Sequence, residues 1–516
     1  MKKHSKKIFA ALALILALAC ALTACAPAAA SSGNTGSKAD STAPTESKTP
    51  EAPVTVKYIN RDAKPDSGNY ETVWKAVNDL LLKNINCTID IEFLGSGDKA
   101  QMALKYAGNE QFDFAFDATW WGYAANAANN AYREYTMDEV KQYMPYMYDK
   151  MPAIGWKQSE INGKMYIIPN LKWEYNYSVV MYRGDLLEKY GMSDLKTLAD
   201  LELYLSNVAK NESGIEPFFN SDRVADIYLT NPNGWITSYS GFYYLAKETT
   251  NPSVFYNVVT DEYLAYAKKM REFYEKGFWS PDASNDSSNP KTKFETGLQA
   301  TYLTNAGSAT YIATNLAESH PEYKIKFFNP SMGAPVVTTS FCSNGWSINR
   351  RAEHPTQAMQ IINFFYSSEE CQKLLNFGIE GVNYDMKDGK VVTRKGVPAD
   401  QAQNIGCNWN FANTLITNAI DGVPKYEGYD EIAADYEKNT FQNPMQAFNF
   451  DRTAVETEVS NINALSSEYK SIVFGMNANV EATVNEYRQK LKDAGLDKVQ
   501  SEYDRQIKEF MASYSK

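Results

Sequence analysis

Three short runs decide the fold: VTVKYI at 54–59, TIDIEFL at 88–94 and FDFAF at 112–116. Their alternating apolar residues and β-branched or aromatic content predict β-strands. Between them, residues 70–84 and 99–107 have helical periodicity. The first of these places Val73, Trp74, Val77, Leu80 and Leu81 on one helical face. The order strand, helix, strand, helix, strand predicts an α/β fold with a parallel sheet and right-handed crossovers.

Polar and aromatic residues follow the first and third of these strands. Ligands of open α/β sheets bind beyond the carboxyl ends of the strands. We therefore predict ligand contacts at Arg61 and Asp62 after the first strand, and at Asp117, Trp120 and Trp121 after the third. Other roles remain open: helix capping for the carboxylates, interior packing for one tryptophan, and pairing of Arg61 with Asp62, Asp66 or an acidic ligand.

The N-terminus predicts export and lipid anchoring. Lysines precede an apolar run at 8–22, which is too short for a comfortable membrane span and is typical of a signal peptide. Leu22-Thr23-Ala24-Cys25 resembles the lipobox of bacterial lipoproteins. We predict a lipoprotein signal peptide at 1–24 and acylation of Cys25, which fits the pattern better than Cys20. The alternative is an ordinary secretory signal with an incidental cysteine.

Residues 25–53 are mostly Ala, Ser, Thr, Pro, Gly and Lys, with almost no aliphatic side chain. Such a segment cannot bury a core, so we predict a disordered tether. Its ends would average roughly 30 Å apart. No second long apolar run occurs in the sequence. The expected location is the extracellular face of the cell membrane, to which the protein is tethered by its lipid.

Composition limits the possible functions. The chain has 516 residues and a net charge of −11, which becomes about −15 without residues 1–24. An acidic body without basic clusters argues against nucleic-acid binding. Beyond the tether, about 460 residues suffice for two or three domains. Aromatic residues are abundant, with 35 Tyr, 24 Phe and 9 Trp, and many stand in polar stretches. That pattern suits a surface that holds polar ligands with apolar faces.

The sequence carries little that could form a catalytic or metal centre. Cys87, Cys342, Cys371 and Cys407 are widely spaced, and only three histidines occur. A zinc site or a Ser-His-Asp triad would have few residues to use. Walker, G-x-G-x-x-G and G-x-S-x-G motifs are missing from the sequence. We expect no metal, no cofactor and no enzymatic activity, and mostly buried thiols with one disulfide possible in this compartment.

A resemblance to a known family emerges from the order of several motifs. GKMYIIPN at 163–170 is followed by YSVVMYRGDLLEKYG at 177–191, FETG at 294–297, GWSI at 345–348 and GIEGVNY at 378–384. This order resembles extracellular solute-binding proteins of the maltose-binding type, in the Gram-positive lipoprotein branch that serves sugar ABC transporters. The last hundred residues resemble that branch's C-terminal extension. The similarity covers nearly the whole chain after the tether.

The resemblance implies an α/β, two-lobe periplasmic-binding-protein-like fold of type II, with a hinge and a helical C-terminal extension. Lobe one would comprise 54–175 and 333–372, and lobe two 176–332 and 373–516. It implies a monomer that captures a carbohydrate, in particular an oligosaccharide, between its lobes and delivers it to the transmembrane subunits of an ABC permease. Peptides or other polar solutes remain an alternative ligand class.

Further ligand contacts follow from the matched motifs. The run at 173–177 mixes aromatic and polar residues at the predicted hinge, and the other candidates stand at loop-like positions, where a structural hydrogen bond is the alternative role. These further candidates are Glu174, Tyr175, Tyr177, Asn305, Trp346, Glu380 and Tyr384. Trp235 and Trp409-Asn410 are weaker candidates, since aromatic loop residues often cover a core.

Two other function classes remain open. A glycoside hydrolase would need two suitably spaced carboxylates and an aromatic cleft, which a chain with 62 acidic residues could supply. A surface adhesin or sensor accessory would bind no small solute. The charged tail at 456–516 has apolar residues at helical spacing, with Val480, Val484, Tyr487 and Leu491 on one face, and 493–496 interrupts the helix. We expect this tail to pack on lobe two, with Asn443 to Arg452 docking it or bordering the ligand cleft.

Overall fold

The computed structural model describes residues 52–65, 69–95, 99–173, 178–219, 223–397, 403–423 and 425–514. Residues from Ala52 onward form one compact unit. The predicted signal peptide, Cys25 and all but the last two residues of the predicted tether lie outside the described residues. They therefore remain predictions.

The first sheet has the predicted parallel core. β1 (Val54–Asn60) lies between β2 (Cys87–Phe93) and β3 (Phe114–Asp117) and is parallel to both. The strand order is β2-β1-β3-β14-β6. β14 (Gly345–Ile348) is antiparallel to β3 and to β6 (Ile167–Pro169), so residues far apart in the sequence complete this sheet.

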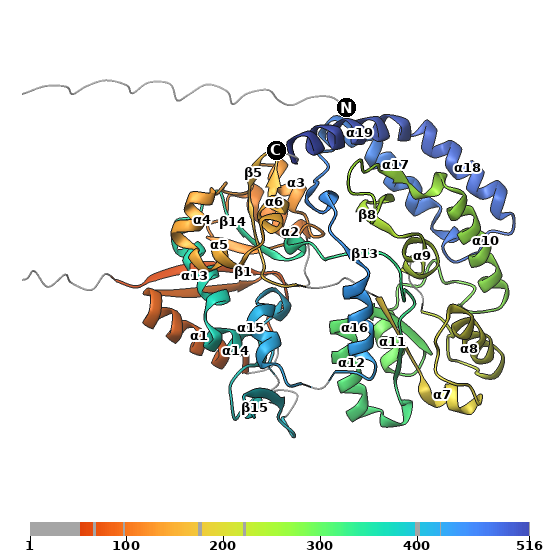
Figure 1. Ribbon diagram of the computed structural model, residues 1–516, viewed down its shortest axis with the longest axis horizontal. Helices are drawn as coiled ribbons and strands as arrows, with labels where there is room; N and C mark the ends of the chain where they lie inside the picture. Colours follow the sequence, from red (N-terminus) through yellow and green to blue (C-terminus); the bar gives the residue numbers. More distant parts are fainter. Residues whose placement is uncertain are drawn as a thin grey trace, which may run out of the picture. The chain divides into compact units, whose positions relative to one another are not determined.

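Helices cover this sheet and form the first lobe with it (Figure 1). α1 (Asn69–Ile85) buries the five residues predicted to form its apolar face. α13 (Pro355–Ser367) and α14 (Glu369–Phe377) contribute to the same core as α1. The other elements of this lobe are α2 (Lys99–Ala107), α3 (Tyr123–Ala128), α4 (Met137–Tyr143), α5 (Pro145–Lys150), α6 (Ala153–Gln158), β4 (Glu160–Ile161) and β5 (Lys164–Met165).

The second lobe has a sheet that is covered on both faces. β7 (Ser178–Tyr182) lies between β11 (Thr301–Asn305) and β12 (Lys326–Phe328) and is antiparallel to both. Successive strand residues point to opposite faces. Val179 and Met181 therefore pack with α12 (Ala306–Ser319), whereas Val180 and Tyr182 enter the large core on the other face. This explains why all five residues of β7 are buried.

Around that sheet the second lobe adds helices and a small antiparallel sheet of order β10-β9-β8. These elements are α7 (Gly184–Lys189), α8 (Leu198–Asn211), α9 (Asn231–Asn233), β8 (Trp235–Tyr239), β9 (Phe242–Leu245), β10 (Phe255–Tyr256), α10 (Asp261–Glu275) and α11 (Pro290–Glu295).

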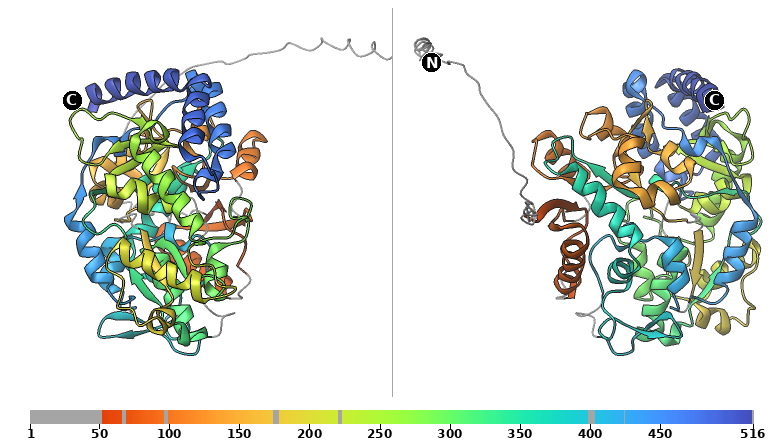
Figure 2. Two further views of the ribbon diagram at one scale, coloured as in Figure 1. Left: turned by 90° about the vertical axis from the view of Figure 1, so that its right-hand side faces the viewer. Right: turned by 60° about the vertical axis from the view of Figure 1, so that its left-hand side comes forward.

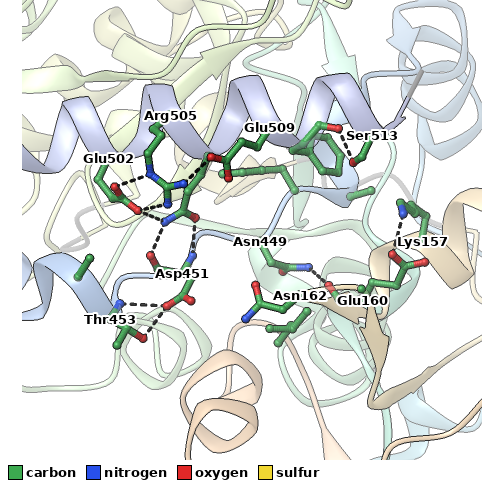
Figure 3. A pocket seen from close by; sticks show the side chains of 17 residues that line it. Lys157, Glu160, Asn162, Asn449, Asp451, Thr453, Glu502, Arg505, Glu509 and Ser513 are labelled. Atoms are coloured by element: carbon green, nitrogen blue, oxygen red, sulfur yellow. Dashed lines mark hydrogen bonds and ion pairs between the residues drawn. The ribbon is translucent and has the colours of Figure 1, made fainter. Parts of the chain in front are cut away.

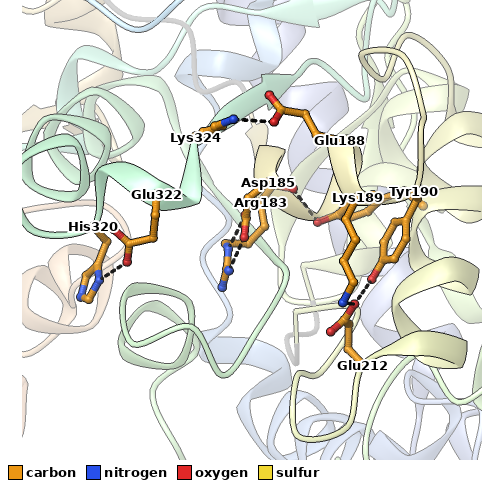
Figure 4. Close-up of polar contacts among 10 residues, drawn as sticks. Arg183, Asp185, Glu188, Lys189, Tyr190, Glu212, His320, Glu322 and Lys324 are labelled. Atoms are coloured by element: carbon orange, nitrogen blue, oxygen red, sulfur yellow. Dashed lines mark hydrogen bonds and ion pairs between the residues drawn. The ribbon is translucent and has the colours of Figure 1, made fainter.

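Arg183 is a structural cation of this lobe (Figure 4). Its guanidinium donates two hydrogen bonds to Asp185, at 2.7 and 2.6 Å, and lies 3.7 Å from the ring centroid of Tyr323. Asp185 and burial of the guanidinium act on it in opposite directions, and the pKa of Arg183 is raised overall. A side chain at Gly297 would meet the Tyr323 hydroxyl at 2.4 Å, so the glycine lets this contact form. Both hydrogen bonds from the Arg183 guanidinium therefore stay within this lobe.

The C-terminal helices pack on the second lobe, as predicted (Figure 2). α17 (Glu456–Glu468), α18 (Val480–Asp493) and α19 (Leu496–Tyr514) share a core with α10, and the break between α18 and α19 contains Gly495 at φ 96°. Phe450 stacks on Tyr503 at 3.7 Å between ring centroids. The segment before α17 therefore docks the tail, one of the two roles predicted for it.

The stretch after residue 373 divides between the two lobes. Leu375, Ile405 and Phe411 lie in the core of the first lobe, together with β1. Tyr426 and Tyr436 lie instead in the core under α12. We therefore propose that the last crossing falls near residue 424 rather than at 373, because Phe411 fills the space against Trp346 at 5.0 Å. The remaining elements of the two lobes are β13 (Val336–Val337), β15 (Tyr384–Lys387), β16 (Lys390–Thr393), α15 (Thr414–Ile420), α16 (Tyr429–Lys438) and β17 (Thr440–Phe441).

Within the described residues, no helix is both long and apolar enough to cross a bilayer. Cys87, Cys342, Cys371 and Cys407 are buried free thiols. Burial raises the pKa of Cys342 and Cys371, which keeps these thiols protonated and inert.

Candidate functional site

The carboxyl end of β1 holds a loop from much later in the chain. Asn60 is fully buried, and its side-chain amide donates to the carbonyl oxygens of Ile405 and Gly406 at 3.3 and 3.1 Å. The carboxylate of Asp62 accepts the backbone N–H of Cys407 at 2.8 Å. Gly406 has φ 71°, and a side chain there would come within 3.0 Å of Asn60. These contacts bring the loop at 405–409 to the sheet edge where the ligand contacts were predicted.

Arg61 lies at the centre of an aromatic cluster at that edge. Its guanidinium carbon is 5.6 Å from the ring of Phe116, 5.2 Å from Trp120, 6.0 Å from Trp121 and 5.9 Å from Trp409. Among the described residues, Arg61 pairs with the carboxylate of Asp62, at 3.7 Å from Nη1. That separation allows an ion pair, but it exceeds hydrogen-bonding distance. The structure thus brings together Arg61, Asp62 and Trp120 from the sequence prediction.

All nine tryptophans lie in the described residues, and they fall into two groups. Six are buried: Trp74, Trp121, Trp156, Trp235, Trp279 and Trp346. The other three, Trp120, Trp173 and Trp409, are 48, 42 and 37% exposed. Because exposing an indole to water is unfavourable, three exposed indoles in one place indicate a surface that is covered in another state.

The three exposed tryptophans contact the same short loop, residues 341–344. The indole N–H of Trp120 donates to the carbonyl of Ser343 at 2.6 Å, and that of Trp409 donates to the Asn344 side chain at 3.2 Å. The ring of Trp173 stands edge-on to Phe341 at 4.8 Å. We call these three side chains the tryptophan platform.

The loop under the platform is held from several directions. The Phe341 N–H donates to the side chain of Gln158 at 2.8 Å, and the Phe341 carbonyl accepts from Asn170 N–H at 3.0 Å. The Cys342 carbonyl accepts from Thr119 N–H at 3.0 Å. The loop is therefore fixed to both sides of the sheet edge, which pre-organises the platform.

Three other predicted site residues lie inside the first lobe. Trp346 is fully buried, and its indole donates to the Tyr366 hydroxyl at 3.1 Å. Trp121 is 3% exposed and packs on Phe116. The structure therefore places both indoles in the core rather than on a ligand surface; Trp346 belongs to a strand that is buried on both faces.

Asp117 is also fully buried, and it accepts the Ala118 N–H at 2.8 Å. Burial raises the pKa of Asp117 to about 6. The role of this carboxyl is thus internal in this structure. An exposed hydroxyl acceptor at this strand end would have to come from another residue.

The remaining predicted residues lie apart from the platform or outside the described residues. Glu380 is exposed, and Tyr384 is buried against Phe377 at 6.2 Å. Asn305 caps α12 by accepting the Ser308 N–H at 2.9 Å, and it stands opposite Ser178 in the second sheet. Glu174, Tyr175 and Tyr177 lie outside the described residues, between Trp173 and β7.

Trp173 and Trp409 are the platform residues that received too little weight in the sequence-based prediction. Trp173 opens the predicted hinge run, and Trp409 was ranked as a weak candidate. The signal that could have ranked them higher is their composition context, since both stand among polar residues and Asn. Lys99, Ser343 and Asn344 carried no such signal. They contact Trp120 or Trp409 only because the fold brings distant segments together.

A cavity of about 650 Å³ lies elsewhere, where the C-terminal extension meets the first lobe (Figure 3). Its charged side chains pair with one another: Arg505 with Glu502 and Glu509, and Lys157 with Glu160. Asn449 donates to the carbonyl of Glu160 at 2.9 Å. The cavity thus lies at a joint between the extension and the first lobe, and the cations that line it are already paired.

Among the described residues, no group of three or more His, Cys, Asp or Glu side chains could hold a metal ion. The tryptophan platform, together with Arg61 and Asp62, offers a ligand ring faces, N–H donors and one carboxylate. These are the groups that hold a polar organic solute with apolar faces.

Comparisons with known proteins agree with this architecture. Residues 444–512 match the family model described as a domain of unknown function, DUF3502. The chain is 24% identical, over 99% of its length and 99% of the relative's, to a carbohydrate ABC transporter substrate-binding protein of Streptococcus pneumoniae serotype 4. It is also 24% identical, over 62% of its length and 66% of the relative's, to the polygalacturonan/rhamnogalacturonan-binding protein YtcQ of Bacillus subtilis strain 168.

Among solved structures, the N-glycan transport solute binding protein NgtS of Streptococcus pneumoniae, in complex with Man1GlcNAc, superposes with a TM-score of 0.68. The identity is 19%, and the match covers 89% of this chain and 99% of that one. This likeness establishes the fold. The chain therefore has the two-lobe fold of these solute-binding proteins and is similar to a carbohydrate ABC transporter substrate-binding protein over nearly its full length.

Proposed function

We propose that the protein is the substrate-binding component of an ABC importer and captures an oligosaccharide. The observation that carries this proposal is the tryptophan platform: the three exposed tryptophans of the chain all surround the loop at 341–344. A pyranose ring presents a C–H face that packs on an indole, and its hydroxyls need hydrogen-bond partners once they leave water. Several exposed indoles around one segment suit several sugar units.

The relatives support the same class of ligand. The full-length relative is named as a carbohydrate-binding component, and the structural neighbour was solved with a glycan. Both are similar to this chain across most or all of its length. A peptide ligand would also use the two-lobe fold, and the platform together with these relatives favours a sugar.

Capture would proceed by closure of the lobes about the hinge. A ligand shifts an open–closed equilibrium only by its differential affinity for the two states, so each lobe must contribute contacts to the closed form. The platform belongs to the first lobe. On the second lobe, we propose Asn305 as its counterpart, and we propose further contacts from the hinge residues Glu174, Tyr175 and Tyr177.

The proposed setting is the outer face of the cell membrane. Acylation at Cys25 would anchor the protein there, and a permease would receive the ligand from the closed form. We propose that the protein acts as a monomer without enzymatic activity, which fits relatives that are transport components.

Calorimetry and thermal shift of the purified protein against a panel of oligosaccharides and peptides test the proposal. We expect stabilisation by a subset of oligosaccharides and none by peptides. Stabilisation by peptides alone would refute the sugar assignment. Turnover of a bound glycan, seen as shorter products by chromatography, would instead favour the glycoside hydrolase alternative.

A further inference from the structure

Arg61 is a cation that makes no hydrogen bond through its guanidinium to any other described residue. Its side chain is 19% exposed, and its Nε is buried without a hydrogen-bond partner among the described residues. Its ion pair with Asp62, at 3.7 Å, is too long for a hydrogen bond. A guanidinium has five N–H donors in a fixed fork. Such a group, enclosed by aromatic rings, has most of its donors left for a ligand.

Arg183 shows what a purely structural arginine looks like in the same protein. It also lies over an aromatic ring, but its fork is filled by two hydrogen bonds to Asp185, at 2.7 and 2.6 Å. Burial of a charged group is costly unless that group is paired and hydrogen-bonded. The contrast indicates that the partner of Arg61 is not supplied by the described chain.

The charges around the platform favour an anionic partner. Lys99 donates to the backbone carbonyl of Trp120 at 2.9 Å, so a second positive charge stands at the residue whose ring contacts Arg61. Asp62 is the carboxylate paired with Arg61, and it also accepts the N–H of Cys407. The chain as a whole has a net charge of −11, whereas Arg61 and Lys99 are both positive. Two neighbouring positive charges attract anions to this part of the surface.

We propose that Arg61 selects acidic oligosaccharides by binding a ligand carboxylate, while the adjoining sugar ring packs on Trp120 and Trp409. A carboxylate fills the guanidinium fork with two parallel hydrogen bonds and balances its charge. A sugar hydroxyl would accept one of these bonds and would leave the guanidinium with only its long ion pair to Asp62 when the lobes close. This inference rests on the proposed capture of an oligosaccharide and adds the class of sugar.

The experiment is calorimetric titration of the full chain with matched pairs of trisaccharides. Each pair shares ring configuration and linkage and differs only at C6, where a carboxylate replaces a hydroxymethyl group. The pairs are galacturonate with galactose, glucuronate with glucose and mannuronate with mannose. We expect the acidic member of one pair to bind roughly ten to a hundred times more tightly than its neutral partner.

Arg61→Gln should abolish this preference. Arg61→Gln should lower the affinity for the acidic ligand by roughly tenfold to a hundredfold and change the affinity for the neutral ligand by less than about threefold. Arg61→Lys should retain part of the preference. Arg452→Gln is the matched control, since Arg452 also lies over a tyrosine ring and pairs with Glu456 on the second lobe. It should leave both affinities unchanged.

Three results would overturn the inference. If the wild-type protein binds neutral trisaccharides as tightly as acidic ones, the protein captures sugars but Arg61 does not select acids. An equal loss for both ligands in Arg61→Gln, with an unchanged melting temperature, would assign Arg61 to positioning the platform. If peptides alone bind, the proposed function itself fails, and the inference fails with it.

Discussion

The indole N–H of Trp120 donates to the carbonyl oxygen of Ser343 at 2.6 Å, across 223 positions of sequence. This bond fixes one edge of the indole to the loop at 341–344 and leaves 48% of the side chain exposed. An exposed indole held in one orientation loses little conformational entropy when a ligand covers it.

Trp120→Ala should therefore weaken every bound oligosaccharide roughly tenfold, because a ring contact of about 1 kcal/mol or more is lost. Calorimetric titration of the wild type and the variant measures this. Tyr148→Ala is the control, since Tyr148 is 43% exposed on α5 and does not belong to the platform. Equal affinity of Trp120→Ala and the wild type would show that the platform is not the ligand surface.

Asp117→Asn should stabilise the protein above pH 6. Burial raises the pKa of Asp117 from 3.8 to about 6, so the folded protein holds its proton more tightly than the unfolded chain. Between these two values the free energy of unfolding falls as pH rises, by about 3 kcal/mol in all. Asparagine resembles the protonated acid and removes this loss. Urea unfolding at pH 4 to 8 should show a gain for the variant that grows up to about pH 6 and then levels off.

Asp113→Asn provides the opposite control. The two oxygens of Asp113 accept the backbone N–H groups of Lys57 and His354, at 2.9 and 2.7 Å. An amide replaces one of these acceptors with a donor, so we expect a loss of roughly 1 to 3 kcal/mol. A pH-independent effect of Asp117→Asn would contradict the assignment of the titration to that carboxyl.

Gly406→Ala should weaken both stability and ligand binding. Its φ of 71° disfavours a side chain, and a Cβ would meet Asn60 at 3.0 Å and Phe93 at 3.1 Å. Displacement of this loop would move Cys407 away from Asp62 and Trp409 away from Arg61. Gly396→Ala isolates the backbone cost, because its φ is 74° and open space surrounds it. Melting temperatures and affinities of the two variants should differ, with Gly406→Ala the weaker binder.

Cys25→Ser should release the protein into the medium with its ligand affinity unchanged. Acyl chains on Cys25 would supply the membrane attachment, while the ligand platform lies in the folded body. Fractionation of cells expressing the wild type and Cys25→Ser, followed by titration of the released protein, measures both effects. Retention of the variant at the membrane would contradict the assignment of the lipid to Cys25, and Cys20→Ser would then test the rival cysteine.

Local periodicity was sufficient to predict the elements that carry their own pattern. The parallel core of the first sheet and the apolar face of α1 follow from residue spacing, as does the break between α18 and α19. The helix face and the helix break depend on side chains within one turn of one another, and the parallel pairing follows from the order of strands and helices. Such contacts are written into a short window of sequence.

The site could be predicted only in part, because it depends on contacts between distant segments. Trp346 and Trp409 both stand in short polar contexts, yet β14 is buried on both faces and Trp409 lies on a loop. A four-residue strand covered on both sides gives no alternation that would separate core from surface. Likewise, the convergence of three tryptophans on the loop at 341–344 follows from where the chain returns to the first lobe.

The position of β14 has a consequence for how the nascent chain folds. One edge of β3 stays unpaired until Gly345–Ile348 has been synthesised, and the core of the second lobe waits for Tyr503 and Ile507 near the end of the chain. At ordinary translation rates, the delay between β3 and β14 alone is on the order of 10 to 50 s. The core of the second lobe therefore cannot be completed until synthesis is almost finished. The open edge of β3 needs protection from aggregation until β14 has been made.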